Sequence, residues 1–134
     1  MIAGFSRVDI TPPVGIPLMG TCMSIDRICQ GVRDFIFVRA AYLRRGDREL
    51  LIIAFDVCFV GRQDADRFKA VLHRRLGIAP CDIMLNTSHS HASPPLGIFL
   101  DLKYVAPQWD YLDQLDAAVA RAAIEARDGA VEVR

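Results

Sequence analysis

Two histidines, His89 and His91, lie one residue apart in the stretch NTSHSHASPP, which follows an apolar run. Imidazole is the commonest side-chain ligand for zinc and related metals. Residues i and i+2 of a strand point to the same face, so both rings could address one ion or one substrate if extended geometry persists through Ser90. A catalytic zinc usually has three protein ligands, however, so the pair would be only part of a site.

The same stretch has a second interpretation that needs no metal. Side chains such as Asn86 and Ser93 bind loop backbone groups at many strand ends, and the histidines are then simply hydrated. A His-x-His spacing by itself has a high false-positive rate as a motif. The local pattern therefore leaves both interpretations open.

The elements around the pair predict an α/β fold in a single domain, residues 1–134. Alternating apolar residues indicate strands, apolar residues at spacings of three and four indicate helices, and a turn is expected at Gly46-Asp47. We expect a mixed sheet with a hairpin, a right-handed βαβ unit and helices packed on the sheet. The predicted elements are a strand in 2–10, a hairpin of 35–43 and 50–57, a helix in 62–76, a short strand in 82–89 and a helix in 108–127.

The βαβ unit places the two predicted parallel strands so that their carboxyl ends meet at one edge of the sheet. Asp56, near the end of the run 50–57, would then lie at the same edge as His89, where ligands bind in open α/β folds. Metal-bound histidines generally donate their second N–H to such a group. The run 50–57 is so uniformly apolar that we expect both of its faces to be covered. His73 lies near the polar side of the predicted helix 62–76, so we expect it to be hydrated and not a ligand.

The composition narrows the classes of partner. The formal net charge is zero, which indicates neither a nucleic-acid nor a membrane-surface partner. The longest apolar run is far shorter than the roughly 18 to 20 residues of a membrane span. The first residues lack a signal-peptide pattern, so we expect a cytoplasmic location. The strand-like ending AVEVR indicates the first part of a longer fold.

The cysteines carry no motif that predicts a function. They form no C-x-x-C pair, and we expect free thiols in a reducing compartment. Their positions are Cys22, Cys29, Cys58 and Cys81.

Four segments resemble the amino-terminal part of the neutral/alkaline non-lysosomal ceramidase family. They are AGFSRVDITPPVGIPLMG, GVRDFIFVRAAYL, LLIIAFDV and IMLNTSHSHASP, in that order. The resemblance implies an α/β catalytic domain with one zinc ion that hydrolyses the amide of N-acylsphingosine to sphingosine and a fatty acid. By the resemblance, His89 matches a zinc ligand, and His91 matches a histidine beside the metal that acts on the substrate amide.

The resemblance also implies supporting residues and limits. By the resemblance, Asp56 is expected to support the site. Apart from the resemblance, Asn86 and Arg33 are candidates to support the site or to face the substrate. Arg33 could bind an anionic substrate group if it reaches the edge of the sheet, and is otherwise an exposed loop residue. Arg33 stands where many members have a histidine, and the glycine that usually follows the histidine pair is absent. The remaining zinc ligands of the family would lie beyond position 134. We therefore expect the isolated chain to bind zinc weakly or not at all and to have no turnover.

A second function remains open: a non-catalytic domain of the same ancestry, used for packing or for partner binding. A coding sequence that continues beyond Arg134 with further His, Glu and Tyr ligands would favour the enzyme. An immediate stop would favour the non-catalytic domain. For the enzyme, the expected partner is a small-molecule or lipid amide substrate, and nothing in the residues indicates the oligomeric state.

Overall fold

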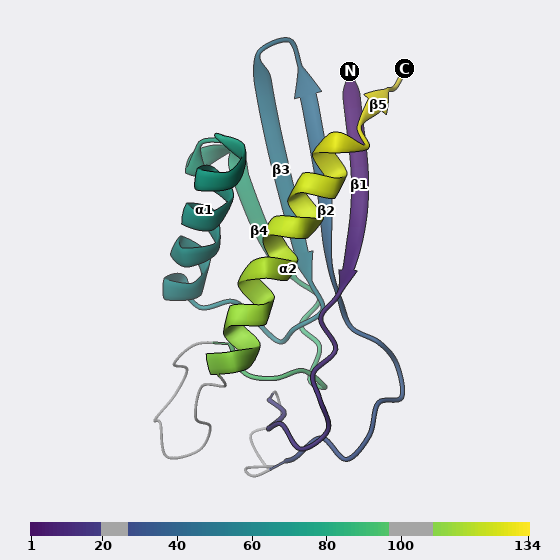
Figure 1. Ribbon diagram of the computed structural model, residues 1–134, viewed down its shortest axis with the longest axis vertical. Coiled ribbons are helices and arrows are strands. Elements are labelled where there is room, and N and C mark those ends of the chain that lie inside the picture. Colours follow the sequence, from purple (N-terminus) through teal and green to yellow (C-terminus); the bar gives the residue numbers. More distant parts are fainter. Residues whose placement is uncertain (20–26, 97–108) are drawn as a thin grey trace.

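The computed structural model describes residues 1–19, 27–96 and 109–134, apart from the side chain of Trp109. One five-stranded sheet runs in the order β4-β3-β2-β1-β5, with β3 and β4 parallel and the other neighbours antiparallel (Figure 1). The elements are β1 (Ile2–Asp9), β2 (Phe37–Arg45), β3 (Arg48–Phe55), α1 (Arg62–Leu76), a 3-10 turn (Pro80–Asp82), β4 (Ile83–Thr87), α2 (Trp109–Asp128) and β5 (Val131–Glu132). The mixed sheet, the hairpin and the βαβ unit are as the sequence predicts.

Local signals account for the boundaries of the hairpin and of the first helix. The β2–β3 hairpin turns at Gly46-Asp47, and Gly46 has a φ of 59°. α1 ends where Gly77 adopts a φ of 76° and donates its N–H to the carbonyl of His73 at 2.8 Å. Glycine occupies this left-handed region without the steric cost that a Cβ brings. His73 is exposed, as the sequence predicts.

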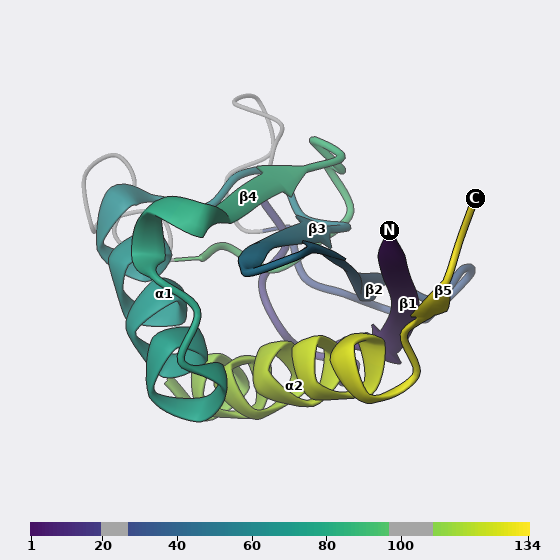
Figure 2. The same ribbon diagram turned by 90° about the horizontal axis from the view of Figure 1, so that it is seen from above.

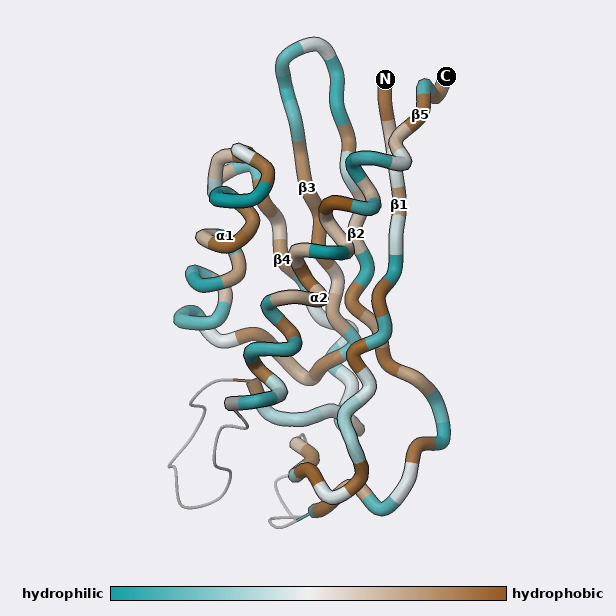
Figure 3. Tube along the Cα trace, viewed as in Figure 1, coloured by the Kyte–Doolittle hydropathy of each residue, from teal (hydrophilic) through white to brown (hydrophobic). Residues whose placement is uncertain are grey.

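Both helices pack on the same face of the sheet (Figure 2). Leu51, Ile53 and Phe55 alternate along β3 toward that face and are fully buried. Burying each such side chain stabilises the fold by about 1.5–3 kcal/mol. The strands that form this core contain many hydrophobic residues, which are coloured brown in Figure 3.

The opposite face of the sheet is open over the residues that the structure describes. Leu50 in β3 is 39% exposed, Met84 in β4 is 55% exposed and Phe5 in β1 is 74% exposed. The expectation that both faces of the run 50–57 are covered is therefore wrong for this part of the chain. The run is apolar on both faces, but the described helices cover only one.

The parallel pair β3–β4 positions the histidines. Its register places Phe55 beside Thr87, the last residue of each strand. The pairing then continues into the loops, because the N–H of Ser88 donates to the carbonyl of Phe55 at 2.9 Å and that of Ser90 to Val57 at 3.2 Å. The segment after β3 and the segment after β4 consequently run side by side at one edge of the sheet. No helix among the described residues is long and apolar enough to span a membrane.

Candidate metal centre

Three side chains with metal-binding atoms meet at this edge: Cys58, His89 and His91. One ligand atom from each lies within 4.8 Å of the other two. Cys58 comes from the segment after β3 and is 4% exposed, whereas both histidines follow β4 and are exposed. The cluster thus combines a thiol at the edge of the core with two imidazoles that solvent reaches.

The histidines meet by a turn and not by strand alternation. β4 ends at Thr87, and His89 adopts a left-handed backbone with a φ of 59°. The strand predicted over 82–89 therefore ends earlier than expected, and the extended geometry through Ser90, the condition for a shared strand face, is not met. The rings nevertheless lie edge to face, with centroids 4.7 Å apart and planes at 71°.

Hydrogen bonds hold the backbone of Cys58 on both sides of its side chain. Its carbonyl accepts from Nδ1 of His89 at 2.8 Å and from the hydroxyl of Thr87 at 3.3 Å. Its N–H donates to Oγ of Ser93 at 3.1 Å, and that hydroxyl donates to the carbonyl of Ser90 at 3.1 Å. Because a carbonyl can only accept, Nδ1 of His89 carries the proton and Nε2 keeps a free lone pair.

We expect replacement of Ser93 by alanine to lower the free energy of unfolding by about 1–2 kcal/mol, because the N–H of Cys58 then loses its buried acceptor. Ser93 is fully buried, so water cannot readily replace its hydroxyl. Urea denaturation would measure the loss. Ser88→Ala is the matched control, because Ser88 is exposed in the same loop. Equal midpoints for the two variants would contradict this account.

The three side chains fit a zinc ion by the chemistry of their donors. A thiolate and two imidazoles are typical zinc ligands, and three is the number that a catalytic zinc usually takes from the protein. Burial raises the pKa of the Cys58 thiol, so in the absence of an ion the neutral thiol is favoured.

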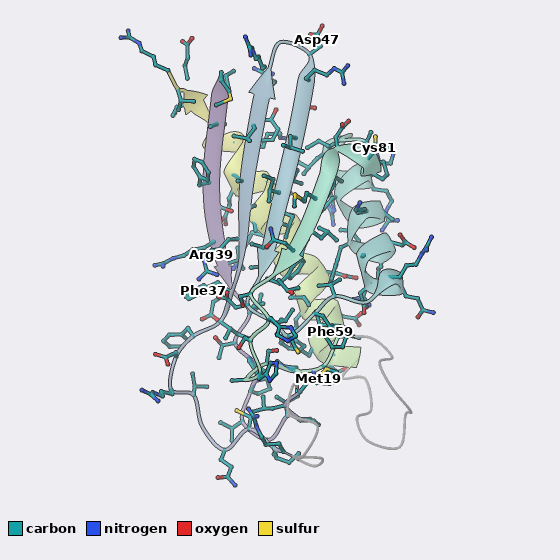
Figure 4. The ribbon with its side chains drawn as sticks, turned by 180° about the vertical axis from the view of Figure 1, so that it is seen from behind. Met19, Phe37, Arg39, Asp47, Phe59 and Cys81 are labelled. Carbon is teal, nitrogen blue, oxygen red and sulfur yellow. The ribbon has the colours of Figure 1, made fainter. Side chains whose placement is uncertain are left out.

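Asp56, which was expected to support the histidines, is bound to strand β2 instead. Asp56 lies at the same edge but points toward β2, where Oδ2 accepts from the N–H of Phe37 at 3.0 Å and pairs with the Arg39 guanidinium at 2.6 Å. Figure 4 labels Phe37 and Arg39 at the start of β2. For His89, the carbonyl of Cys58 takes the accepting role that was expected of Asp56.

Asn86 and Arg33 are both solvent-exposed. Asn86 lies in β4 beside Ala54. The Arg33 side chain is 96% exposed and lies 3.8 Å from the Asp34 carboxylate. The structure thus brings His89 and His91 together and adds Cys58, which the sequence analysis had assigned no function. Its place two residues after Asp56, just beyond the same strand, was the signal that could have indicated it.

A shallow pocket of about 310 Å³ lies elsewhere, between β1 and α2. Its lining contains none of the three metal-binding side chains, so we do not assign it to the candidate centre. The lining residues are Val8, Asp9, Gln114, Ala117, Ala118 and Arg121.

Comparison with known proteins gives a match in three dimensions. No protein-family model matches the chain, and no curated protein matches it significantly. The crystal structure of neutral ceramidase from Pseudomonas aeruginosa matches 96% of this chain with a TM-score of 0.83 at 19% identity. A structure described as ceramidase complexed with C2 matches 96% with a TM-score of 0.82 at 17% identity. The chain has a neutral-ceramidase-like fold.

The neutral-ceramidase-like fold confirms the fold that the resemblance in sequence implied. A structural match at such low sequence identity establishes the fold and not the activity. The chain covers 22% of the first ceramidase chain and 21% of the second, about a fifth of their length. Activity, substrate and cofactor are therefore matters for proposal.

Proposed function

We propose that this chain forms part of the active site of a zinc-dependent amidohydrolase that acts on an N-acyl amide of the ceramide type. One observation carries the proposal: His89 and His91 meet at the carboxyl edge of the parallel strands in a neutral-ceramidase-like fold. The edge where parallel strands end is where open α/β folds bind their ligands. A ceramide-type substrate is favoured because both matched structures are described as ceramidases.

The two histidines have different roles in this proposal. His89 holds the metal through Nε2, and its Nδ1–H bond to the carbonyl of Cys58 fixes the orientation of the ring. His91 is exposed and lies beside it, so its imidazole faces the substrate. When bound, zinc lowers the pKa of a bound water and polarises the amide carbonyl.

His91 moves the proton that amide hydrolysis requires. Water adds its oxygen to the acyl carbon, the carbon–nitrogen bond breaks, and the amine nitrogen takes up a proton. The His91 imidazole accepts the proton from water and delivers it to the leaving nitrogen. The guanidinium of Arg27 donates to the backbone carbonyl of His91 at 2.7 Å and steadies this segment.

In this proposal Asp56 stabilises the edge of the sheet, whereas Asn86 and Arg33 have a different role. Asp56 connects the end of β3 to Phe37 and Arg39 in β2. Asn86 and Arg33 would face the substrate from the surface.

We expect His91→Ala to lower the rate of hydrolysis by about a hundredfold or more, because a positioned general acid–base group contributes that much. The assay follows fatty-acid release from an N-acylsphingosine by the complete gene product loaded with zinc. His73→Ala is the control, because that histidine is exposed at the far end of α1.

The alternative, a non-catalytic domain of the same ancestry, predicts a different result. A complete gene product that is folded and loaded with zinc but releases no fatty acid would favour it. Equal rates for His91→Ala and the unsubstituted protein would contradict the role of His91 and leave the fold unaffected.

A further inference from the structure

We propose that Ser93 is a positioning residue of the candidate site. Its buried hydroxyl holds the backbone of Cys58 so that the Cys58 carbonyl keeps His89 protonated at Nδ1, with the lone pair on Nε2. Ser93 acts through Cys58 and is assigned no contact with a substrate. The inference rests on the proposed function for the role of His89, but the protonated nitrogen can be identified without metal or substrate.

The hydroxyl of Ser93 connects the two segments that form the site. Its oxygen accepts from the N–H of Cys58 at 3.1 Å, in the segment after β3. Its proton is donated to the carbonyl of Ser90 at 3.1 Å, the residue between the two histidines. A serine hydroxyl has one proton to donate and lone pairs to accept with, so both bonds can form together. This one side chain therefore ties the backbone of Cys58 to the turn that carries both imidazoles.

Ser93 is itself held in place. Its side chain is fully buried, so the protein and not water determines where the hydroxyl points. Its carbonyl accepts from the N–H of Met19 at 2.8 Å in an isolated antiparallel bridge. Figure 4 labels Met19 at this end of the sheet. A group whose own position is fixed can orient the residues of a site precisely.

The Cys58 carbonyl transmits this position to His89. It accepts from Nδ1 of His89 at 2.8 Å and from the hydroxyl of Thr87 at 3.3 Å, which occupies both of its lone pairs. Without the Ser93 hydroxyl, the N–H of Cys58 would be buried with no acceptor. That costs more than one ordinary hydrogen bond contributes, so the segment should turn toward another acceptor and carry the carbonyl away from the ring. A neutral imidazole released in this way favours the Nε2–H form, which has no lone pair at Nε2.

Nitrogen-15 NMR of the imidazole rings tests the proposal, because protonated and unprotonated ring nitrogens have different chemical shifts. The metal-free chain is measured at mildly alkaline pH, where imidazole is neutral. We expect His89 to be protonated at Nδ1. Ser93→Ala should shift the ratio of the Nδ1–H to the Nε2–H form by about five- to tenfold, the effect of losing one ordinary hydrogen bond.

The other histidines make the spectrum interpretable. The chain has three histidines, and His89→Asn identifies the signals of His89, since asparagine tolerates the left-handed backbone there. His73 is an internal reference, because its Nδ1 lies 2.9 Å from the carbonyl of Ile78, beyond the end of α1. Its signals should be the same in every variant.

Cys58→Ala is the matched control for Ser93→Ala. It removes a buried side chain, and with it the sulfur that lies 3.8 Å from Nδ1 of His89, but it keeps the N–H and the carbonyl of the residue. We expect this variant to lose stability without a change in the tautomer ratio of His89. Ser93→Thr keeps the hydroxyl and should retain the Nδ1–H form. Circular dichroism establishes that each variant is folded.

Three results would overturn the role of Ser93. They are Nε2–H as the main form of His89 in the unsubstituted chain, an unchanged ratio in Ser93→Ala, and an equal change in Cys58→Ala, which would show a merely structural effect. Should Ser93→Ala not fold, a folded Ser93→Thr that loses the Nδ1–H form would overturn it as well.

Activity separates this inference from the proposed hydrolase. In the complete gene product, Ser93→Ala should weaken zinc binding by about ten- to a hundredfold, as is usual when a group that orients a ligand is lost. A changed tautomer ratio together with absence of hydrolysis would support the role of Ser93 and contradict the hydrolase. Hydrolysis together with an unchanged ratio would do the reverse.

Discussion

Gly4→Ala is expected to lower the free energy of unfolding by about 3 kcal/mol, at the upper end of the usual cost of overpacking. A Cβ at Gly4 would lie 1.9 Å from the carbonyl oxygen of Ala126 and 2.8 Å from Cα of Ala130. These are backbone atoms of the end of α2 and of the residue that precedes β5. Because they cannot turn aside as a flexible side chain can, β1 and α2 must separate.

The clash outweighs the opposing effect of alanine on the unfolded chain. Replacing glycine by alanine at a compatible position stabilises a protein by about 0.4–1 kcal/mol, since the unfolded chain loses conformational freedom. That gain in stability is smaller than the expected cost of the clash. Urea denaturation followed by circular dichroism would measure the difference.

Gly31→Ala is the matched control for Gly4→Ala. A Cβ at Gly31 meets no atom within 4 Å, so we expect its unfolding midpoint to stay close to that of the unsubstituted chain. Equal midpoints for Gly4→Ala and Gly31→Ala would show that α2 does not pack on β1 as described.

Arg67→Met is expected to lower the free energy of unfolding at neutral pH by about 2 kcal/mol. Arg67 in α1 lies 3.3 Å from the carboxylate of Asp64 and 3.2 Å from that of Asp116 in α2. Removing one partner of a buried ion pair costs about 3–5 kcal/mol. The expected loss is smaller here, because the side chains of Arg67 and Asp116 remain 31% and 26% exposed. Methionine keeps an unbranched apolar side chain at this position and removes the guanidinium, whose Cζ also lies 5.1 Å from the centre of the Phe68 ring.

The stability that Arg67→Met loses should depend on pH, because the carboxyls of Asp64 and Asp116 change their charge with pH. Burial raises the pKa of Asp64 and of Asp116, and the Arg67 charge opposes both increases. A carboxyl with a raised pKa in the folded state binds its proton more tightly there than in the unfolded chain. Its contribution to stability therefore falls as pH rises from the pKa of the unfolded chain to the pKa of the folded protein. Without Arg67 both pKa values rise further, so the penalty is greatest at neutral pH and shrinks as pH approaches the ordinary aspartate value of 3.8.

Urea denaturation of the two proteins at neutral and acidic pH would test this dependence. Arg62→Met is the control, because its pair with Asp66 spans 4.0 Å and both side chains are exposed. Exposed pairs contribute little. A penalty for Arg67→Met that stays constant or grows on acidification would contradict the burial of the two carboxyls.

Features set by neighbouring residues were predictable from the sequence. The hairpin turn at Gly46-Asp47 and the helix 62–76 agree with the predicted positions, because glycine at a turn and apolar residues at helical spacing act over a few residues. The parallel arrangement of β3 and β4 also followed, since a strand, a helix and a second strand leave few alternatives.

The direction in which a side chain points at the carboxyl edge of the sheet was not predictable in this way. Asp56 was correctly expected at this edge, yet its side chain turns toward Arg39 in β2. Nothing in the residues beside Asp56 determines which neighbouring strand supplies its partner. The open face of β3 is a similar case, because an apolar side chain does not specify whether another layer covers it.

The sequence by itself determined that two imidazoles would lie together at the end of a strand, since His89 and His91 are separated by a single residue. Only the tertiary structure decided that Cys58 joins them. The thiol is 31 residues from His89 in the chain, and the register between β3 and β4 sets its distance from the rings. The left-handed turn at His89 and the buried hydroxyl of Ser93 then fix its direction. Such long-range pairing depends on how strands pack, and no local pattern of residues encodes it.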